Sequence, residues 1–265
     1  MTQTELDKCV DWDFVKDKIF PRLVKRVGNE DKLKSTLRKD IFDMSIIFYV
    51  HIDSSWCNNL NSYKICMMTD YYTDQWGKSF DEVYSVALKN LEGRKKDIIV
   101  NRCEELVEAI DERGKDLTDK LKKKISEEGI FKDVNNEVIE NFVQATINEV
   151  NEFASNLFFL VGIRDVCCGS SIILSKAMLD EIAKNIGESF YCIPVYLGTL
   201  MVIKKSFDEK SKNSLNVSTK DFIKEFINIT LRANNNRKQG DGKQEEVSKT
   251  AFLYNTDTRK LELVG

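Results

Sequence analysis

Hydrophobic and polar residues repeat most regularly between residues 170 and 204, and the rest of the predicted fold is arranged around this segment. Ile172 to Leu174 is a short apolar run, which predicts a strand. Apolar residues then recur every three or four positions from Met178 to Ile186, the spacing of one buried helix face. Ser175 is a favourable N-cap and Gly187 a favourable C-terminal stop, so they predict the two ends of this helix.

Two nearly continuous apolar runs follow the helix, Phe190 to Val195 and Leu200 to Ile203. Such runs are typical of buried strands. Pro194 has no backbone N–H to donate, so we expect the first of these strands to end or bulge there. The remaining C-terminal part predicts a helix at 218–233, a mobile loop at 234–248 that is low in apolar residues, and a β-hairpin at 251–264.

The N-terminal part predicts shorter elements. Its patterns indicate helices at 5–20 and 30–37, an extended piece at 22–24, and strands at 43–52 and 63–69. A polar connection separates the two strands, so we expect an antiparallel hairpin with a long loop. Ser79 and Glu82 match a capping box, in which the two residues satisfy each other's N–H groups, and they predict the start of another helix.

The middle of the chain differs, because residues 94–153 contain no proline and carry apolar stripes at helical spacing. We therefore expect an inserted helical segment at 94–155 within a single domain that spans 1–265. The predicted fold class is α/β of the α+β type. It consists of a mixed, largely antiparallel sheet with flanking helices and a helical insertion in the middle of the chain.

Composition and charge narrow the function classes. Of the 265 residues, 31% are charged and 42% are hydrophobic, and the formal net charge is −3. This balance argues against a dedicated polyanion-binding surface. No apolar run is long enough to span a bilayer, and the N-terminus does not resemble a signal peptide. We expect a cytoplasmic protein without membrane contact, whose seven scattered cysteines are reduced.

Several blocks of the sequence resemble a bacterial family of unknown function. Residues 42–48 are Phe-Asp-Met-Ser-Ile-Ile-Phe, where the family tends to have Leu-Asp-Leu-Ala-Val-Val-Tyr. Further similar blocks are 15–25, 68–70, 76–77, 81–90, 161–203 and the final hairpin. The chain thus resembles domain-of-unknown-function family five-six-eight-eight, which is common in clostridial genomes and on conjugative elements. None of these blocks is a catalytic motif, so the resemblance implies a fold and no chemistry.

One departure from the family pattern bears on function. After the proline of the last strand pair the family usually carries Ser-Ser-Ile-His-Glu, whereas this chain has Val-Tyr-Leu-Gly-Thr at 195–199. No pair of nucleophile and base remains at these positions. The resemblance therefore implies a divergent member that keeps the scaffold and lacks the polar cluster, and we lean against an enzyme.

The candidates for chemistry are few. His51 is the single histidine, so any Ser-His or Cys-His catalysis would have to use it, but it ends an apolar strand, where a structural role is common. We predict no catalytic residue, no metal and no cofactor, because the cysteines lack the paired spacing of a zinc site. A pocket for a small molecule or a hydrolase substrate stays open as an alternative, near Asp43, His51, Asp70 and Cys168.

Exposed aromatic residues are the more suggestive feature, since Tyr and Trp are enriched at protein interfaces. Candidates in predicted loops or at the ends of elements are Trp56, Tyr71, Tyr72, Trp76 and Tyr196. Packing in the core at the ends of the sheet is the alternative explanation for them.

Three functional hypotheses follow. The first is a non-enzymatic module that binds a protein partner, in its sharpest form an inhibitor of a host defence protein carried by a mobile element and comparable to an anti-CRISPR. The second is the small-molecule or hydrolase pocket. The third is nucleic-acid binding through the basic residues at 94–96 and 120–124, which the acidic residues beside them disfavour.

Overall fold

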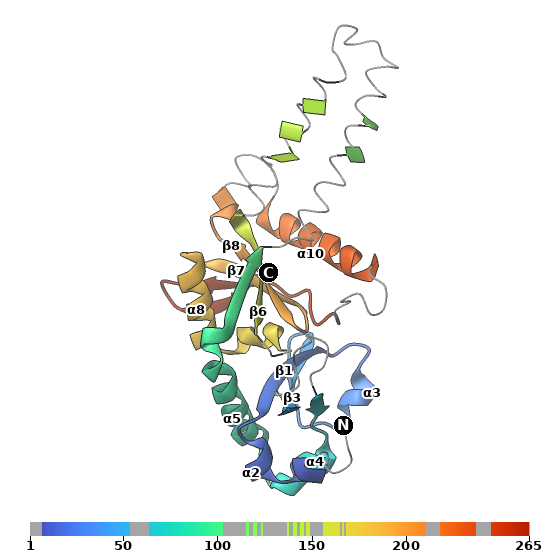
Figure 1. Ribbon diagram of the computed structural model, residues 1–265, viewed down its shortest axis with the longest axis vertical. Helices are drawn as coiled ribbons and strands as arrows, with labels where there is room; N and C mark the ends of the chain where they lie inside the picture. Colours follow the sequence, from blue (N-terminus) through green and yellow to red (C-terminus); the bar gives the residue numbers. More distant parts are fainter. Residues whose placement is uncertain are drawn as a thin grey trace. The chain divides into compact units, whose positions relative to one another are not determined.

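The structure is a computed structural model that describes residues 7–53, 64–102, 156–164, 166, 168–209, 218–236 and 245–264, together with scattered positions between 115 and 148. The chain divides into two compact units. The first comprises Met1–Val100, Leu160–Lys205 and Gln244–Gly265, and the second comprises Asn101–Phe159 and Ser206–Lys243. Figure 1 shows the elements of both units.

The first unit contains a four-stranded sheet that is built on one long strand, β3 (Met44–Asp53). The strand β1 (Ile19–Lys25) pairs antiparallel with one edge of β3 over its whole length. The strands β2 (Lys39–Ile41) and β4 (Lys64–Met67) share the other edge and are also antiparallel to β3. The predicted hairpin of the two N-terminal strands is therefore confirmed.

Residues directly opposite each other in an antiparallel ladder lie on the same face of the sheet. Ile19, Phe48 and Val50 share one face, which packs against residues of α2 (Trp12–Val15), α4 (Asp70–Trp76) and α5 (Phe80–Gly93). We call it the helix-covered face. Its buried core consists of Cys9, Val15, Ile19, Phe48, Val50, Met68, Trp76, Val83 and Ala87.

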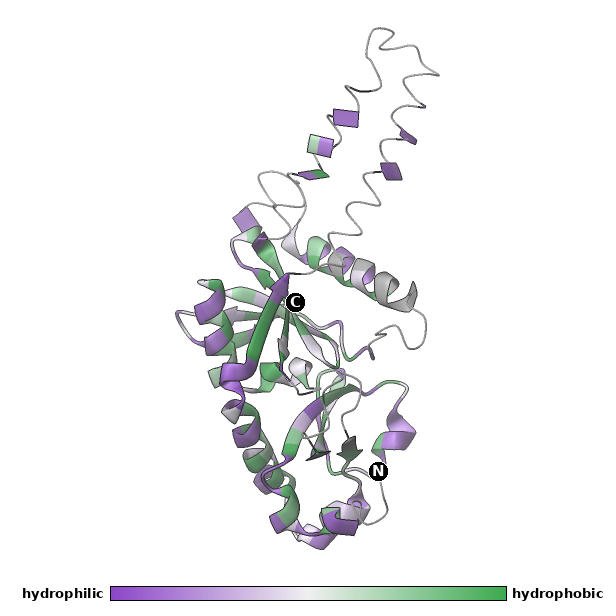
Figure 2. Ribbon diagram, viewed as in Figure 1, coloured by the Kyte–Doolittle hydropathy of each residue, from purple (hydrophilic) through white to green (hydrophobic). Residues whose placement is uncertain are grey.

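The helix α5 forms as its sequence predicts. Ser79 Oγ accepts a hydrogen bond from Glu82 N (3.3 Å), and the Glu82 carboxylate accepts one from Ser79 N (2.9 Å), so the capping box is confirmed. Hydrophobic residues alternate with hydrophilic ones along the helix (Figure 2). The Asn90 side-chain amide donates to Lys16 O (2.7 Å) and Ile19 O (2.9 Å), which fixes α5 to the start of β1.

Two N-terminal predictions are wrong. The described part of the helix predicted at 5–20 is a short 3-10 turn (Lys8–Val10), the short α2 and the start of β1. Asp11 separates the first two because its carboxylate caps α2 by accepting from Asp13 N (2.9 Å). β1 runs through Pro21 because it is an edge strand, where a missing N–H is tolerated. The second predicted helix is shorter than 30–37 and spans α3 (Glu30–Leu33).

A six-stranded sheet has the order β10-β9-β7-β8-β6-β5. The strands are β5 (Ile98–Arg102), β6 (Phe158–Ile163), β7 (Phe190–Tyr196), β8 (Thr199–Lys204), β9 (Phe252–Asn255) and β10 (Lys260–Leu263). The ladders of β7 with β8, of β7 with β9 and of β9 with β10 are antiparallel. The register of β7 with β8 shifts between Ile193 and Tyr196, which confirms the irregularity predicted at Pro194.

Two further predictions need correction. Ile98–Arg102 is a strand although the helical pattern was extended over it, and its β-branched Ile-Ile-Val run explains the preference. Ile172 to Leu174 belongs to a 3-10 helix, η3 (Gly169–Leu174), instead of a strand. A Cβ at Gly169 would lie 2.0 Å from Gly198 O, so the close approach of η3 to the turn between β7 and β8 requires glycine.

The helix α8 (Lys176–Ile186) has the predicted ends. Ser175 Oγ accepts from Met178 N (3.3 Å), and Gly187 has the left-handed φ of 87° that ends helices. Its Asp180 carboxylate accepts hydrogen bonds from Tyr254 Oη and from the Arg259 guanidinium. The C-terminal hairpin of β9 and β10, also as predicted, is thereby tied to α8.

The second unit contains α10 (Thr219–Asn236), which extends beyond the predicted 218–233. Ser218 Oγ accepts from Asp221 N (3.1 Å) at its start, as expected. The rings of Phe158, Phe207 and Phe222 pack together, with centroids 4.3 to 5.5 Å apart. This aromatic cluster is the described core of the unit.

The predicted α+β class with largely antiparallel pairing is confirmed, but the strands form two sheets instead of one. The mobile loop predicted at 234–248 is ordered at both ends, because α10 reaches Asn236 and Val247 is buried, with its N–H bonded to Val195 O (2.7 Å). Most of 103–155 lies outside the described residues, so the helical insertion and the single domain stay predictions.

Candidate functional site

The four residues of the predicted pocket do not meet. Asp43 directly precedes β3, and His51 lies eight residues further along the same extended strand. At a rise of about 3.3 Å per residue, their backbones are roughly 26 Å apart. A single cleft that holds both side chains is therefore excluded, and the predicted pocket is wrong in this form.

Each member of that set has a local structural role. The Asp43 carboxylate accepts from Ser248 Oγ (2.7 Å) and Thr250 Oγ1 (2.9 Å), which fixes the segment before β9. Asp70 opens α4, and its N–H bonds Ser35 O (2.9 Å). Cys168 is buried at the start of η3, where its carbonyl accepts from Ser171 N (2.9 Å).

The aromatic candidates separate by burial. Trp76 and Tyr196 are buried, so the expectation that they are exposed is wrong for both. Trp76 Nε1 donates to Cys9 O (3.0 Å) in the core of the helix-covered face. Tyr71 is 67% exposed on α4, and its ring meets Tyr72 edge to face at 5.1 Å. Trp56 lies outside the described residues.

The opposite face of the four-stranded sheet combines apolar side chains with a few polar ones. Phe20, Arg22 and Val24 of β1 share this face with Ile47 and Tyr49 of β3. The Arg22 guanidinium stacks on the Tyr49 ring, with Cζ 4.3 Å from the centroid. We call this the Arg22 face.

The Arg22 side chain is buried, and its guanidinium has no polar partner among the described residues. Arg22 is 8% exposed, and its Nε is buried without a hydrogen bond. No carboxylate among the described residues lies within ion-pair distance of it.

His51 lies on the Arg22 face, with its ring 4.8 Å from that of Phe20. Burial lowers the pKa of His51 to about 4, and the positive charges of Arg22 and Arg94 add to this effect. The imidazole is therefore neutral at physiological pH and lies in a region of positive potential. It cannot serve as a base poised near neutrality, which weakens the hydrolase hypothesis.

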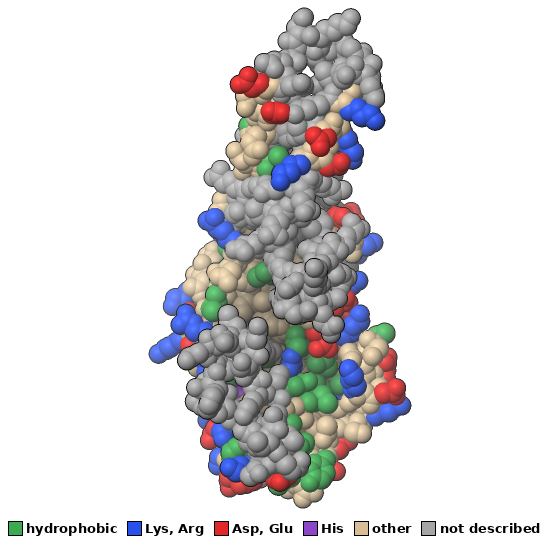
Figure 3. Space-filling view, turned by 45° about the vertical axis from the view of Figure 1, so that its right-hand side comes forward, with side chains coloured by type: hydrophobic (Ala, Val, Ile, Leu, Met, Phe, Trp, Pro, Cys, Tyr) green, Lys and Arg blue, Asp and Glu red, His purple; other side chains and the backbone are tan. Residues whose placement is uncertain are grey.

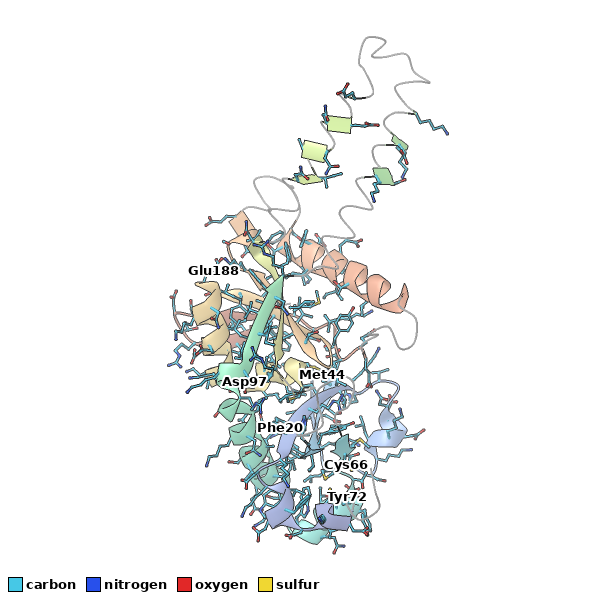
Figure 4. All side chains as sticks on the ribbon, viewed as in Figure 1. Phe20, Met44, Cys66, Tyr72, Asp97 and Glu188 are labelled. Carbon is cyan, nitrogen blue, oxygen red and sulfur yellow. The ribbon has the colours of Figure 1, made fainter. Side chains whose placement is uncertain are left out.

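Two thiols meet at the edge of the helix-covered face. Hydrogen bonds from the Cys9 thiol and the Tyr72 hydroxyl lower the pKa of Cys66 to about 7 against the opposing effect of burial. The pKa of Cys9 is raised by the hydrogen bond between Cys9 and Cys66 and by the burial of Cys9. Cys66 and Tyr72 are close together beside α4 in Figure 4.

Exposed apolar side chains gather at the end of the sheet where β2 turns into β3. Phe42 is 56% exposed and adopts a positive φ of 52°. Its ring meets that of Phe252 edge to face at 5.2 Å, and Phe252 is paired with the 54% exposed Leu263. Arg26 N donates to Asp43 O (3.1 Å), which places the 62% exposed Val27 beside this turn. We call Val27, Phe42 and Leu263 the Phe42 patch.

The rim of this patch is charged. Asp40 lies 3.4 Å from Arg38 and 3.8 Å from Arg26, and Lys25 pairs with Glu246 at 2.9 Å. Figure 3 shows hydrophobic side chains next to charged ones at the height where Figure 1 draws β1, β3 and α3. An apolar centre within a polar rim is the usual anatomy of a protein interface.

Three basic residues of the segments at 94–96 and 120–124 are paired with acids. Arg94 pairs with Asp97 at 2.7 Å, Lys95 approaches Glu181 at 4.0 Å, and Lys120 pairs with Asp116 at 2.6 Å. This pairing lowers the positive potential that a nucleic acid would need. Within the described residues, no cluster of three or more His, Cys, Asp or Glu side chains could hold a metal ion, and no helix has the length and apolar character to cross a membrane.

Comparison with protein families gives one match. A model described as a family of unknown function, DUF5688, matches residues 1–224. The chain belongs to this family. No curated protein and no solved structure matches it.

In this family member, sequence reasoning missed both surfaces that the structure brings out. Arg22 follows Pro21 in an apolar run, and a lone charge in such a run is a signal that could have been weighed. Phe42 precedes Asp43 at a strand start, but only the structure shows its left-handed backbone.

Proposed function

We propose that this protein is a non-enzymatic module that binds a protein partner through the Phe42 patch. The observation that carries the proposal is the conformation of Phe42, a bulky residue with positive φ whose ring is more than half exposed. The left-handed region is unfavourable for such residues by about 1–2 kcal/mol. Strain of this kind persists where function requires it.

The neighbours of Phe42 support a binding role. Three of the large hydrophobic side chains that are most exposed in the first unit, Val27, Phe42 and Leu263, lie around one turn. In a partner complex they would be buried at the centre of the contact, within the charged rim of Arg26, Arg38 and Asp40. The partner therefore presents an apolar side chain surrounded by polar ones.

The alternatives have less support. The residues of the hydrolase pocket are dispersed, the one histidine is neutral and partly buried, and the family's Ser-Ser-Ile-His-Glu cluster is replaced here by Val-Tyr-Leu-Gly-Thr. This replacement is the basis for regarding the chain as a divergent member of its family. We further propose a cytoplasmic partner, in keeping with the seven scattered cysteines, which we expect to be reduced.

A narrower form of the proposal is an inhibitor of a host defence protein, comparable to an anti-CRISPR and carried on a mobile element. It rests on the family resemblance alone, and it suggests which candidate partners to test first. A plasmid-interference assay in a host with an active nuclease tests it, since an inhibitor restores transformation and an unrelated binding module does not.

The main experiment compares three forms of the full chain in affinity capture from a bacterial host lysate. We expect the wild-type chain to retain a stoichiometric partner, Phe42→Asn to lose it, and Tyr71→Asn to keep it. Asn tolerates the left-handed conformation that Phe42 adopts. The free energy of unfolding of the variant should therefore lie within about 0.5 kcal/mol of that of the wild type. Loss of binding would then not be a loss of fold.

Two outcomes would contradict the assignment. If Tyr71→Asn loses the partner and Phe42→Asn keeps it, the exposed aromatic residues of α4 form the interface, as the sequence suggested. If neither variant loses any protein that the wild type retains, or if the wild type only self-associates in light scattering, the Phe42 patch is not a docking site for another protein.

A further inference from the structure

The Arg22 face holds a charge with which no carboxylate of the described residues forms an ion pair. Arg22 is more than nine-tenths buried, its Nε has no hydrogen bond, and no carboxylate of the described residues pairs with it. Glu245 lies near enough to raise the pKa of Tyr49, together with the larger effect of burial, yet it forms no ion pair with Arg22. Buried cations in proteins are nearly always paired, so this one calls for an explanation.

Stacking on Tyr49 explains the orientation of the guanidinium but does not satisfy its donors. Cζ of Arg22 lies over the ring, 4.3 Å from its centroid, and the N–H groups, which lie in the plane of the guanidinium, have no acceptor among the described residues. These donors form the planar fork that recognises carboxylate and phosphate oxygens with two parallel hydrogen bonds.

The surroundings favour a negative ligand. His51 is neutral and adds no charge of its own, and the charge of Arg94 is already paired with Asp97 at 2.7 Å. Apolar neighbours such as Phe20 and Ile47 keep the local dielectric low, which strengthens an interaction with an anion.

We propose that Arg22, held by Tyr49, binds the carboxylate or phosphate group of a small molecule. The ligand provides the counter-charge that the described residues do not supply, and its oxyanion lies against the edge of the guanidinium. This inference is independent of the Phe42 patch.

The test measures thermal unfolding and isothermal titration of the full chain at constant ionic strength, with chloride exchanged for inorganic phosphate or for acetate. We expect one of these oxyanions to raise the Tm, by roughly 5 °C or more at a hundredfold excess over its Kd. The oxyanion that acts identifies the source of the group. In chloride alone, Arg22→Met should have a higher Tm than wild type, because it replaces an unpaired buried charge with an apolar chain of similar length.

The matched control is Arg26→Met, which removes the same charge from a partly exposed residue just beyond β1 that is paired with Asp40. It should keep the oxyanion response, whereas Arg22→Met should lose it at least tenfold in Kd. A wild-type Tm that no oxyanion changes overturns the proposal. So does an Arg22→Met variant that is less stable than wild type in chloride, since the guanidinium would then be a solvated structural group.

Discussion

The two faces of the four-stranded sheet are made by alternate residues of the same strands, yet they differ in chemistry. The helix-covered face buries Ile19, Phe48 and Val50 under three helices. The Arg22 face places Arg22, Tyr49 and His51 at the intervening positions. A shift of one residue in register would exchange the two sets, so the apolar face also fixes where the polar one is displayed.

This difference separates stability from binding. The helix-covered face has few polar groups to satisfy, and those it has, such as the Trp76 indole and the Asn90 amide, are bonded to backbone carbonyls. The Arg22 face keeps a charged donor that has no partner among the described residues, and such a group lowers the stability of the isolated chain. We expect substitutions on the first face to unfold the unit and those on the second to change its response to anions and pH.

The largest effect should come from the helix-covered face. Phe48→Ala removes a fully buried ring from the core and should lower the free energy of unfolding by about 3–5 kcal/mol. Urea denaturation followed by tryptophan fluorescence measures this change, since Trp12 and Trp76 are in contact with the same cluster. Phe48→Leu, which keeps much of the volume, is the control and should lose less than half as much. Equal losses for both variants would contradict a tightly packed face.

The second effect distinguishes the Arg22 face by its pH dependence. The pKa of His51 is about 4 in the folded chain and near 6.5 in the unfolded chain. The unfolded state therefore binds more protons between these values, and stability falls as the pH decreases from 6.5 toward 4. By proton linkage, the free energy of unfolding should decrease by about 2 kcal/mol between about pH 7.5 and pH 5.

His51→Leu is the comparison for this prediction, because carboxylates elsewhere also titrate. The difference in urea midpoint between about pH 7.5 and pH 5 should be smaller in the variant by the amount that His51 contributes. Since the charge of Arg22 is a secondary cause of the low pKa, Arg22→Met should reduce the dependence only in part. An unchanged slope in His51→Leu would show that this histidine is not held neutral.

Apolar spacing and capping residues located α5, α8, the two hairpins and the strands β7 and β8. These signals act locally, as the caps at Ser79, Ser175 and Gly187 show. They failed where tertiary contacts decide. Ile172 to Leu174 has the composition of a strand, but Gly169 must approach Gly198 closely, and the chain turns into a 3-10 helix. Similarly, α4 is a short helix whose Trp76 is drawn inward by a bond to Cys9 O.

The candidate sites were harder to predict for the same reason. Asp43, His51, Asp70 and Cys168 were grouped by residue type, and only the length of β3 shows that the first two cannot meet. The exposure of Phe42 and the lack of a hydrogen bond at Arg22 Nε are properties of the folded chain, so residue types and their spacing do not reveal them.

A smaller effect tests the stack on the Arg22 face. Tyr49→Leu removes the aromatic ring under the guanidinium and should lower stability by about 1 kcal/mol. Tyr49→Phe keeps the ring and should stay within about 0.5 kcal/mol of wild type, measured by the same urea titration. In the Arg22→Met background, Tyr49→Leu should cost less stability than it does in the wild-type chain, because the contact with the guanidinium is already absent. Additive losses would mean that the ring and the guanidinium do not interact.

The smallest expected change in stability accompanies a measurable change in reactivity at the edge of the helix-covered face. Cys66 is half-buried with a pKa of about 7, whereas Cys192 is fully buried and its pKa is raised by that burial. Because the thiolate is the nucleophile, iodoacetamide at about pH 7 should label Cys66 far faster than Cys192. Peptide mass spectrometry measures both rates.

Tyr72→Phe removes a hydrogen bond to the Cys66 thiolate and should slow its labelling with little change in Tm. Equal labelling rates at the two cysteines would show that the Cys66 thiol is no more reactive than a fully buried one.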